Sequence, residues 1–128
     1  MAAMAAMAAL QARRAIIARS TGGRLPATWL DWKAQYCWES ADRAAFAAYF
    51  LAWSETDFSE EIKAARLTLP LLALVGEHDP RFDAALMRRT NLAWYPQARL
   101  EVLGKAGHYP MNETPLALAA SIEAFLLQ

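Results

Sequence analysis

The chain has 128 residues, of which 56% are hydrophobic and 20% are charged. This length suits one domain, and the composition indicates a globular protein and excludes a disordered one. The formal net charge is zero, so no overall field attracts nucleic acid or an anionic membrane surface, and we expect neither as a partner. The single cysteine, Cys37, excludes an internal disulfide and a cysteine-rich zinc site, and we interpret it as a buried packing residue.

The first segment of the chain, residues 1–19, is rich in alanine, which has the highest helix propensity, and is predicted to be a helix. A weak apolar stripe recurs at every third position: Met1, Met4, Met7 and Leu10. Four arginines precede the first acidic residue, Asp31, as in an organelle transit peptide. We favour an ordinary buried helix in a cytoplasmic protein and keep organelle targeting as the alternative. Gly22 or Gly23 is expected to end this helix in the left-handed conformation.

Residues 27–53 are unusually aromatic and contain four of the five tryptophans. Helical spacing brings several aromatic side chains onto shared faces, and Ser40 or Asp42 is expected to begin a second helix. Two interpretations stay open, because such a face is either packed core or a lid over an apolar ligand pocket. The candidate pocket residues on the lid are Trp29, Trp32, Trp38, Tyr49 and Trp53. A polar connection follows over residues 54–70, in which Asp57 or Ser59 is expected to cap a short turn.

The second half of the chain is predicted to alternate strands and helices. Leu71–Val75 is a continuous apolar run, typical of a strand that is buried on both faces. A helix over residues 83–94 with Asp83 as its N-cap, and a second strand over residues 99–103, complete a βαβ unit with two parallel strands. A final helix over residues 115–127 is expected to have Thr114 as its N-cap. Its predicted buried face is Leu118, Ala119, Ile122, Phe125 and Leu126. The fold class is therefore α/β, with residues 1–66 as a helical segment and residues 67–128 as a βαβα unit.

One acid and one base follow the two predicted strands. Asp79 comes three residues after Gly76, and His108 comes four residues after Gly104. Parallel strands present their carboxyl ends at one edge of a sheet, where ligands bind, so we expect the two side chains to meet. A carboxylate that accepts a hydrogen bond from one imidazole nitrogen leaves the other as a general base. The plainer interpretation is a turn-capping Asp and an ordinary loop His; His78 is the weaker candidate base because no glycine turn accompanies it.

These residues lie in a pattern that resembles the C-terminal part of the α/β-hydrolase fold. The stretches LPLLALVGEHDP and ARLEVLGKAGHYPMNETP, followed by a helix that ends in FLL, match the family's last two strands and helices. The resemblance implies that Asp79 is the catalytic acid, that His108 is the catalytic base, and that Glu113-Thr114-Pro115 matches the motif before the last helix. It also implies that the preceding helices are a cap and that the substrate is a small apolar ester or a similar compound. No metal or organic cofactor is implied.

The family's nucleophile motif, G-x-S-x-G, is missing from the chain. The serines lie in helical or linker contexts: Ser20, Ser40, Ser54, Ser59 and Ser121. We therefore expect a fragment or one subunit of a split, esterase-like hydrolase, inactive alone and completed by an N-terminal half. The alternative is a non-catalytic interaction module or remnant that associates through an exposed strand edge, with itself or with a partner.

Overall fold

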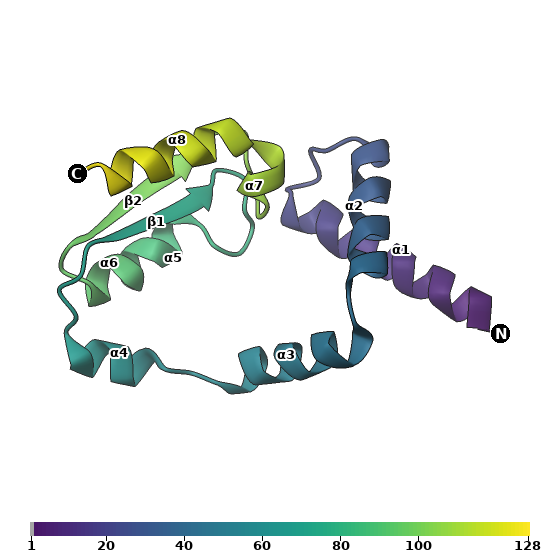
Figure 1. Cartoon of the computed structure of the whole chain (residues 1–128), viewed down its shortest axis with the longest axis horizontal. Coiled ribbons are helices and arrows are strands. Elements are labelled where there is room, and N and C mark those ends of the chain that lie inside the picture. The colour runs from purple at the N-terminus through teal and green to yellow at the C-terminus, as the bar shows by residue number, and fades with distance from the viewer. Residues whose placement is uncertain (1) are drawn as a thin grey trace.

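The computed structural model describes residues 2–128, and the side chains of residue 4 and residues 6–128. Helices form most of the chain, and two strands lie in its second half (Figure 1). The elements in chain order are α1 (Ala2–Ser20), α2 (Ala27–Ser40), α3 (Arg43–Glu55), α4 (Ser59–Ala65), β1 (Leu71–Gly76), α5 (Ala84–Arg89), α6 (Asn91–Trp94), β2 (Ala98–Leu103), α7 (Pro110–Glu113) and α8 (Pro115–Leu126). The α/β class and the parallel strand pair are confirmed, with each strand one residue longer than predicted.

The two strands pair in parallel along their whole length, from Leu71 opposite Ala98 to Gly76 opposite Leu103. In Figure 1, α8 lies on one side of this two-stranded sheet and α5 and α6 lie on the other. The cover is incomplete: in β1, Ala73 and Val75 on one face are buried, whereas Leu72 and Leu74 on the other face are half-buried. The prediction of a strand buried on both faces therefore holds for one face only.

Helices α1 and α2 pack across one another and form a separate small core. Ile17 of α1 and Leu30 and Ala34 of α2 are buried there, with Trp29 and Tyr109 packed against them. The predicted first helix is confirmed over residues 2–19, but the expectation that it is buried is wrong, because Ile17 is its only buried residue among the described side chains and Met4 and Met7 are exposed. Met1 of the proposed stripe lies outside the described residues. Both candidate glycines after it adopt the left-handed conformation, Gly22 with φ 70° and Gly23 with φ 69°. Cys37 is half-buried, so it is less enclosed than the packing residue we expected.

The helix predicted over residues 83–94 is interrupted. Asp83 caps its start as expected, accepting a hydrogen bond from the Leu86 N–H at 2.7 Å. At Thr90 the backbone leaves the helical region, with φ −115° and ψ −93°. The Thr90 hydroxyl donates to the carbonyl of Leu86 at 2.8 Å. A β-branched residue that bonds back to the preceding turn favours such a break, so α5 and α6 form in place of one helix.

The start of the last helix also differs from the prediction. The Thr114 hydroxyl makes no hydrogen bond within residues 2–128, so it is not the expected side-chain cap. The reason is the short helix α7, whose end uses the Thr114 N–H, which donates to the Pro110 carbonyl at 2.9 Å. The predicted buried face of α8 is also wrong in part, because no residue of this helix is fully buried and three of the five predicted residues, Ala119, Ile122 and Leu126, are exposed.

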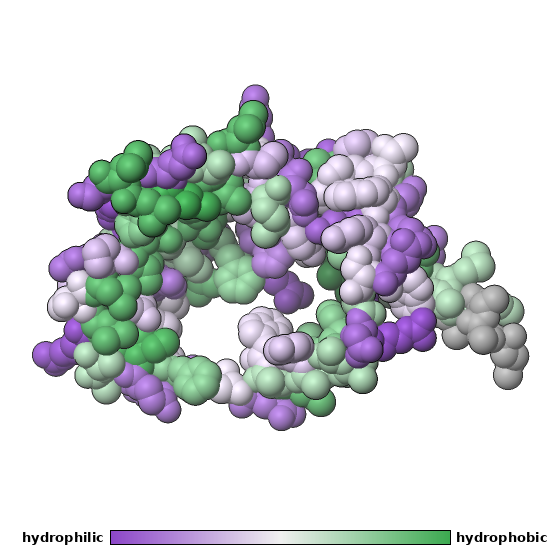
Figure 2. All heavy atoms as spheres, viewed as in Figure 1, coloured by the Kyte–Doolittle hydropathy of each residue, from purple (hydrophilic) through white to green (hydrophobic). Residues whose placement is uncertain are grey.

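Helix α3 has the least cover of the long helices. Asp42, one of the two residues expected to begin this helix, is its N-cap and accepts a hydrogen bond from the Ala45 N–H at 2.8 Å. None of its residues is buried. Its exposed large apolar side chains are Phe46, Tyr49, Phe50, Leu51 and Trp53. Figure 2 shows open space between the α3–α4 arm and the rest of the molecule. Within residues 2–128, no helix combines the length and apolarity that a bilayer crossing requires.

Candidate active site

Parallel pairing of β1 and β2 carries the loops that follow them to the same edge of the sheet. Two backbone hydrogen bonds continue the ladder into these loops: the Glu77 N–H donates to Leu103 at 3.0 Å and the His78 N–H donates to Ala106 at 2.9 Å. The loops touch at Gly76, where an added Cβ would lie 2.1 Å from the carbonyl oxygen of Gly107. Glycine is therefore needed at this end of β1 so that the two backbones can approach.

The structure brings Asp79 and His108 together where the two loops touch, and we call this part of the molecule the corner. Oδ2 of Asp79 lies 2.8 Å from Nδ1 of His108. The other carboxylate oxygen, Oδ1, accepts from the backbone N–H groups of Arg81 at 2.9 Å and Phe82 at 3.1 Å. The Asp79 side chain is only 6% exposed. Asp79 thus closes its own turn with one oxygen and holds the imidazole with the other.

The environment of Asp79 favours its ionised form. Burial raises the pKa of the carboxyl, but the hydrogen bonds from the Arg81 N–H, the His108 ring and the Phe82 N–H lower it further than burial raises it. The net pKa of Asp79 lies below its ordinary value. An ionised carboxylate only accepts hydrogen bonds, so Nδ1 of His108 carries the proton.

The ring of His108 is held but not enclosed. It stacks on Phe82 with 5.5 Å between ring centroids and meets Tyr109 edge-on at 5.2 Å. Its side chain is 36% exposed, and Nε2 makes no hydrogen bond within residues 2–128. Burial raises the pKa of Tyr109, so the neighbouring phenol stays neutral near neutral pH. Nε2 is therefore the nitrogen that is free to accept a proton from a group outside this corner.

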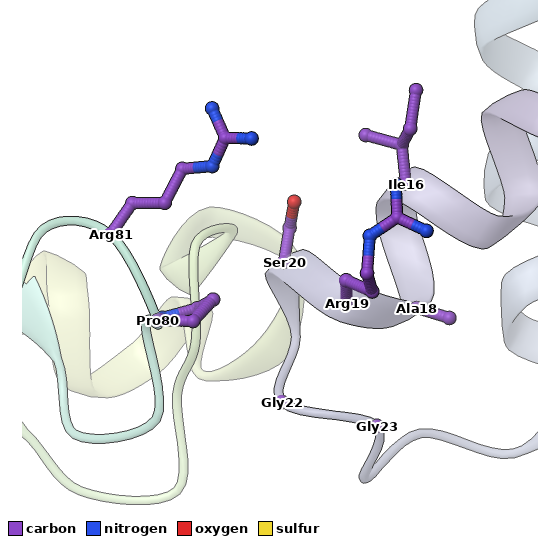
Figure 3. A pocket seen from close by; sticks show the side chains of 8 residues that line it. All are labelled: Ile16, Ala18, Arg19, Ser20, Gly22, Gly23, Pro80 and Arg81. Atoms are coloured by element: carbon purple, nitrogen blue, oxygen red, sulfur yellow. The ribbon is translucent and has the colours of Figure 1, made fainter.

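Two hollows adjoin the loop that carries Asp79. One, with a volume of about 270 Å³, is lined by Leu74, Val75, Gly76, Asp79, Phe82, Gly107, His108, Pro110 and Met111. The other, with a volume of about 580 Å³, lies between Pro80-Arg81 and the end of α1. Figure 3 shows Arg81 and Arg19 extending from opposite sides of this larger hollow. We place the chemistry in the smaller hollow, because it alone is lined by the acid and the base.

The five candidate lid residues are distributed over α2 and α3. Trp29 packs against the α1–α2 core, and Trp32 is exposed and stacks on Tyr36 at 5.9 Å. Trp38 lies under the guanidinium of Arg43, 4.4 Å from ring centroid to Cζ. Tyr49 and Trp53 are exposed on α3. None of the five lines the hollow beside His108, so their part in binding a substrate stays a prediction.

Within residues 2–128, the side chains of the other candidate groups make no hydrogen bond to the side chains of Asp79 and His108. His78 faces Glu77, with Nε2 3.4 Å from Oε2. Of the five serines, Ser54 and Ser121 lie inside α3 and α8, Ser40 is the last residue of α2, and Ser59 is the first residue of α4. Ser20 is the last residue of α1, and its carbonyl accepts from the His108 N–H at 3.0 Å. Within residues 2–128, no group of three His, Cys, Asp or Glu side chains is placed to hold a metal ion.

Sequence reasoning missed two residues that support the corner. Glu113 accepts hydrogen bonds from the backbone on both sides of His108, and Arg24 pairs with Glu113 at 2.8 Å. In the sequence, the only indication of a role for Glu113 is its place in the Glu113-Thr114-Pro115 motif that follows the histidine. Nothing near Arg24 in the sequence indicated a partner 89 positions away.

Comparisons of the chain with protein-family models, with curated proteins and with solved structures find no match. The residue pattern and the geometry of the corner are therefore what any functional assignment depends on.

Proposed function

We propose that this chain carries the acid–base part of an α/β-hydrolase active site. The observation that carries the proposal is the 2.8 Å contact between Asp79 Oδ2 and His108 Nδ1 at the carboxyl ends of two adjacent parallel strands. The contact fixes the tautomer in which Nε2 is the base. In this assignment α2 to α4 are the cap, and the five aromatic residues named above are the candidate lid side of the substrate pocket.

The reaction is the hydrolysis of an ester or a similar bond in a small apolar substrate. Nε2 of His108 takes the proton of a nucleophilic hydroxyl as its oxygen bonds to the carbonyl carbon, and gives that proton to the leaving alcohol as the ester bond breaks. His108 then takes a proton from water as the water oxygen bonds to the acyl carbon, and returns that proton to the nucleophile's oxygen as the acyl bond breaks and the acid leaves. Asp79 stays ionised throughout and stabilises the imidazolium form of His108.

The nucleophile in this proposal comes from outside residues 2–128. Ser54 and Ser121 lie inside helices, and the other three serines lie at helix ends that no strand adjoins. A nucleophile elbow needs a sharp turn from a strand into a helix. An acid–base pair without its nucleophile retains at most weak catalysis from binding and electrostatic stabilisation. The hydrolytic activity therefore belongs to an assembly in which another polypeptide segment meets His108.

The exposed surface of the chain supports such an assembly. The accessible area is 8986 Å², whereas a compact monomer of 14.2 kDa exposes about 6,800 Å². The surplus of roughly 2,000 Å² exceeds the area that one partner buries in a standard protein–protein interface, about 800 Å². Much of the exposed apolar surface lies on α3 and α8 (Figure 2).

The same surplus favours one alternative function, a non-catalytic module that associates through its surface. Each strand of the sheet pairs with only one neighbour within residues 2–128, so each has an unpaired edge open to β-augmentation. The two functions differ in what they require of His108, which is essential to the first and dispensable to the second.

A serine-reactive phosphonate probe tests the proposal. We expect no labelling of this chain alone, and labelling would show that one of its own serines is activated. Ser20→Ala is the informative variant in that case, because Ser20 is the serine that contacts the His108 backbone.

The complementing segment provides the positive arm of the test. The DNA that encodes the residues upstream is first inspected for G-x-S-x-G, and that polypeptide is mixed with this chain and assayed with short-chain esters. His108→Ala should lower the restored activity by about 10⁴-fold or more. His78→Ala is the matched control and should leave it unchanged. Activity that survives in the His108 variant would remove this residue from the mechanism and favour the interaction module.

A further inference from the structure

Glu113 is a buried carboxylate that the proposed chemistry does not use. Its side chain is 1% exposed. A buried charge is tolerated in a folded protein only when hydrogen bonds or an opposite charge compensate for its lost hydration. The groups that bind the Glu113 carboxylate therefore indicate its role in the structure.

Both oxygens of Glu113 bind the backbone of the histidine loop. The Gly107 N–H donates to Oε2 at 3.0 Å, and the Tyr109 N–H donates to Oε1 at 3.1 Å. These two amides flank His108. One carboxylate thus holds the amide nitrogens of the residues before and after the histidine, and so restricts the direction in which the Cα–Cβ bond of His108 points.

The turn after α1 holds the same loop from the other side. The His108 N–H donates to the carbonyl of Ser20 at 3.0 Å. Gly107 packs so closely on this turn that an added Cβ would lie 2.9 Å from Cα of Thr21. Three consecutive amides of the loop, at residues 107, 108 and 109, are therefore all bound by groups from other segments.

Arg24 joins the two supports. Its Nη2 lies 2.8 Å from Oε2 of Glu113 and also donates to the carbonyl of Lys105 at 3.2 Å. The guanidinium compensates the buried charge of Glu113 and ties the turn after α1 to the start of the histidine loop. The contact with Asp79 fixes the rotation of the imidazole through Nδ1, whereas these contacts fix the backbone to which the His108 side chain is attached.

We propose that Glu113 and Arg24 are positioning residues for His108, and that the turn at residues 20–24 is a structural part of the acid–base site. The inference rests on the proposed function, because positioning His108 matters for catalysis only if this histidine is the base. Its test is separate, because it measures the geometry of His108 in this chain without substrate or partner.

Nuclear magnetic resonance of the full ¹⁵N-labelled chain provides the measurement. The chain has two histidines, so His78→Gln identifies the signals of His108. The hydrogen bond to Asp79 should give a strongly deshielded Nδ1 proton resonance. In Glu113→Gln we expect this resonance to be lost, and the Gly107 and Tyr109 amides to exchange with solvent about 10- to 100-fold faster, as the loss of charge-assisted bonds implies.

Two controls separate positioning from general damage. Asp79→Asn should remove the Nδ1 resonance and leave the slow exchange of the Gly107 and Tyr109 amides in place. Glu123→Gln, at an exposed carboxylate on α8, should change neither signal. A Glu113→Gln protein that keeps the Nδ1 resonance while its amides exchange faster would overturn the proposal, because Glu113 would then support the loop without setting the imidazole.

A second pair of variants keeps the test decisive if Glu113→Gln does not fold. Arg24 is partly exposed, and Arg24→Ala leaves both bonds of Glu113 to the loop available. We expect Arg24→Ala to weaken the Nδ1 resonance and Arg24→Lys to restore it, because lysine keeps the charge next to Glu113. An unchanged resonance in Arg24→Ala would exclude Arg24 from the positioning role. Normal His108 signals in the unaltered chain, together with no esterase activity after the complementing segment is added, would count against the proposed function and leave the positioning role intact.

Discussion

The corner that holds Asp79 and His108 and the arm formed by α3 and α4 are built in opposite ways. In the corner, polar groups of distant segments satisfy one another, as Arg24 and Glu113 do. In the arm, no residue of α3 is buried, and Tyr49 is 78% exposed. The corner is thus complete within this chain, whereas the arm presents apolar surface that nothing within the described residues covers.

The difference shows that order at a site does not require a large core around it. The buried apolar residues of the described chain are few, yet the histidine loop is held by directional bonds on both sides. Directional bonds specify geometry at particular atoms, whereas apolar area supplies most of the favourable free energy of folding. We therefore expect substitutions to act strongly in the corner and weakly in the arm.

The largest effect is expected where the two loops of the corner touch. In Gly76→Ala the new Cβ would lie 2.1 Å from the Gly107 carbonyl oxygen and 2.6 Å from that of Ala106. Both neighbours are backbone atoms, so the strands must separate, and we expect a loss of about 3 kcal/mol or more in the free energy of unfolding. Urea denaturation followed by tryptophan fluorescence measures it.

Gly104→Ala is the matched control for this prediction. Gly104 follows the other strand of the same sheet, but its nearest neighbour to an added Cβ is Oε2 of Glu77 at 3.9 Å. We expect a change of at most about 0.5 kcal/mol. Equal losses in Gly76→Ala and Gly104→Ala would contradict the close approach of the two loops.

The effect of pH on the free energy of unfolding should be intermediate in size, and it should be larger for a carboxylate in the corner than for one in the arm. The pKa of Asp79 is lowered in the folded chain, so near pH 4 the unfolded state binds more protons than the folded state. Stability from this group is therefore present above about pH 5 and is lost as the pH falls through the folded pKa. Asp79→Asn should cost about 1–3 kcal/mol at pH 7 and progressively less in acid.

Asp57→Asn in the arm is the comparison. The Ser59 N–H lowers the pKa of Asp57 as well, but this carboxylate is exposed, and solvent screens its interactions. Unfolding curves between pH 3 and pH 7 should show a strong pH dependence of the difference from wild type for Asp79→Asn and a weak one for Asp57→Asn. The reverse order would mean that the bond between Asp79 and His108 does not persist in solution.

The meeting of Asp79 and His108 could be predicted because it depends on a local rule. Each residue follows an apolar run and a glycine, and parallel strands bring their carboxyl ends together. The supports of the loop could not be predicted in the same way. The pair of Arg24 and Glu113 joins residues 89 positions apart, and no periodicity or motif specifies such a contact before the fold is known.

The elements show the same division between local and distant causes. The turn at Gly22 and Gly23 and the caps at Asp42 and Asp83 depend on adjacent residues, and the sequence pattern predicts them. The cover of α8 depends on what packs against it, so helical periodicity alone overstated its burial. Periodicity indicates which face of a helix is apolar, and it does not show whether that face has a partner.

The smallest effect on stability is expected in the arm, together with a clear effect on association. The double variant Tyr49→Ser, Trp53→Ser removes two of the most exposed aromatic side chains of α3, so each change should alter the free energy of unfolding by at most about 0.5 kcal/mol. If the arm is the surface that a partner or a second copy covers, sedimentation should show association weakened at least tenfold, since buried aromatic residues dominate interface energies. Ala52→Ser, an exposed change on the same helix, should leave association unchanged. A double variant whose free energy of unfolding falls by several kcal/mol while its association is unchanged would show that α3 packs against its own chain. The contrast between the corner and the arm would then be wrong.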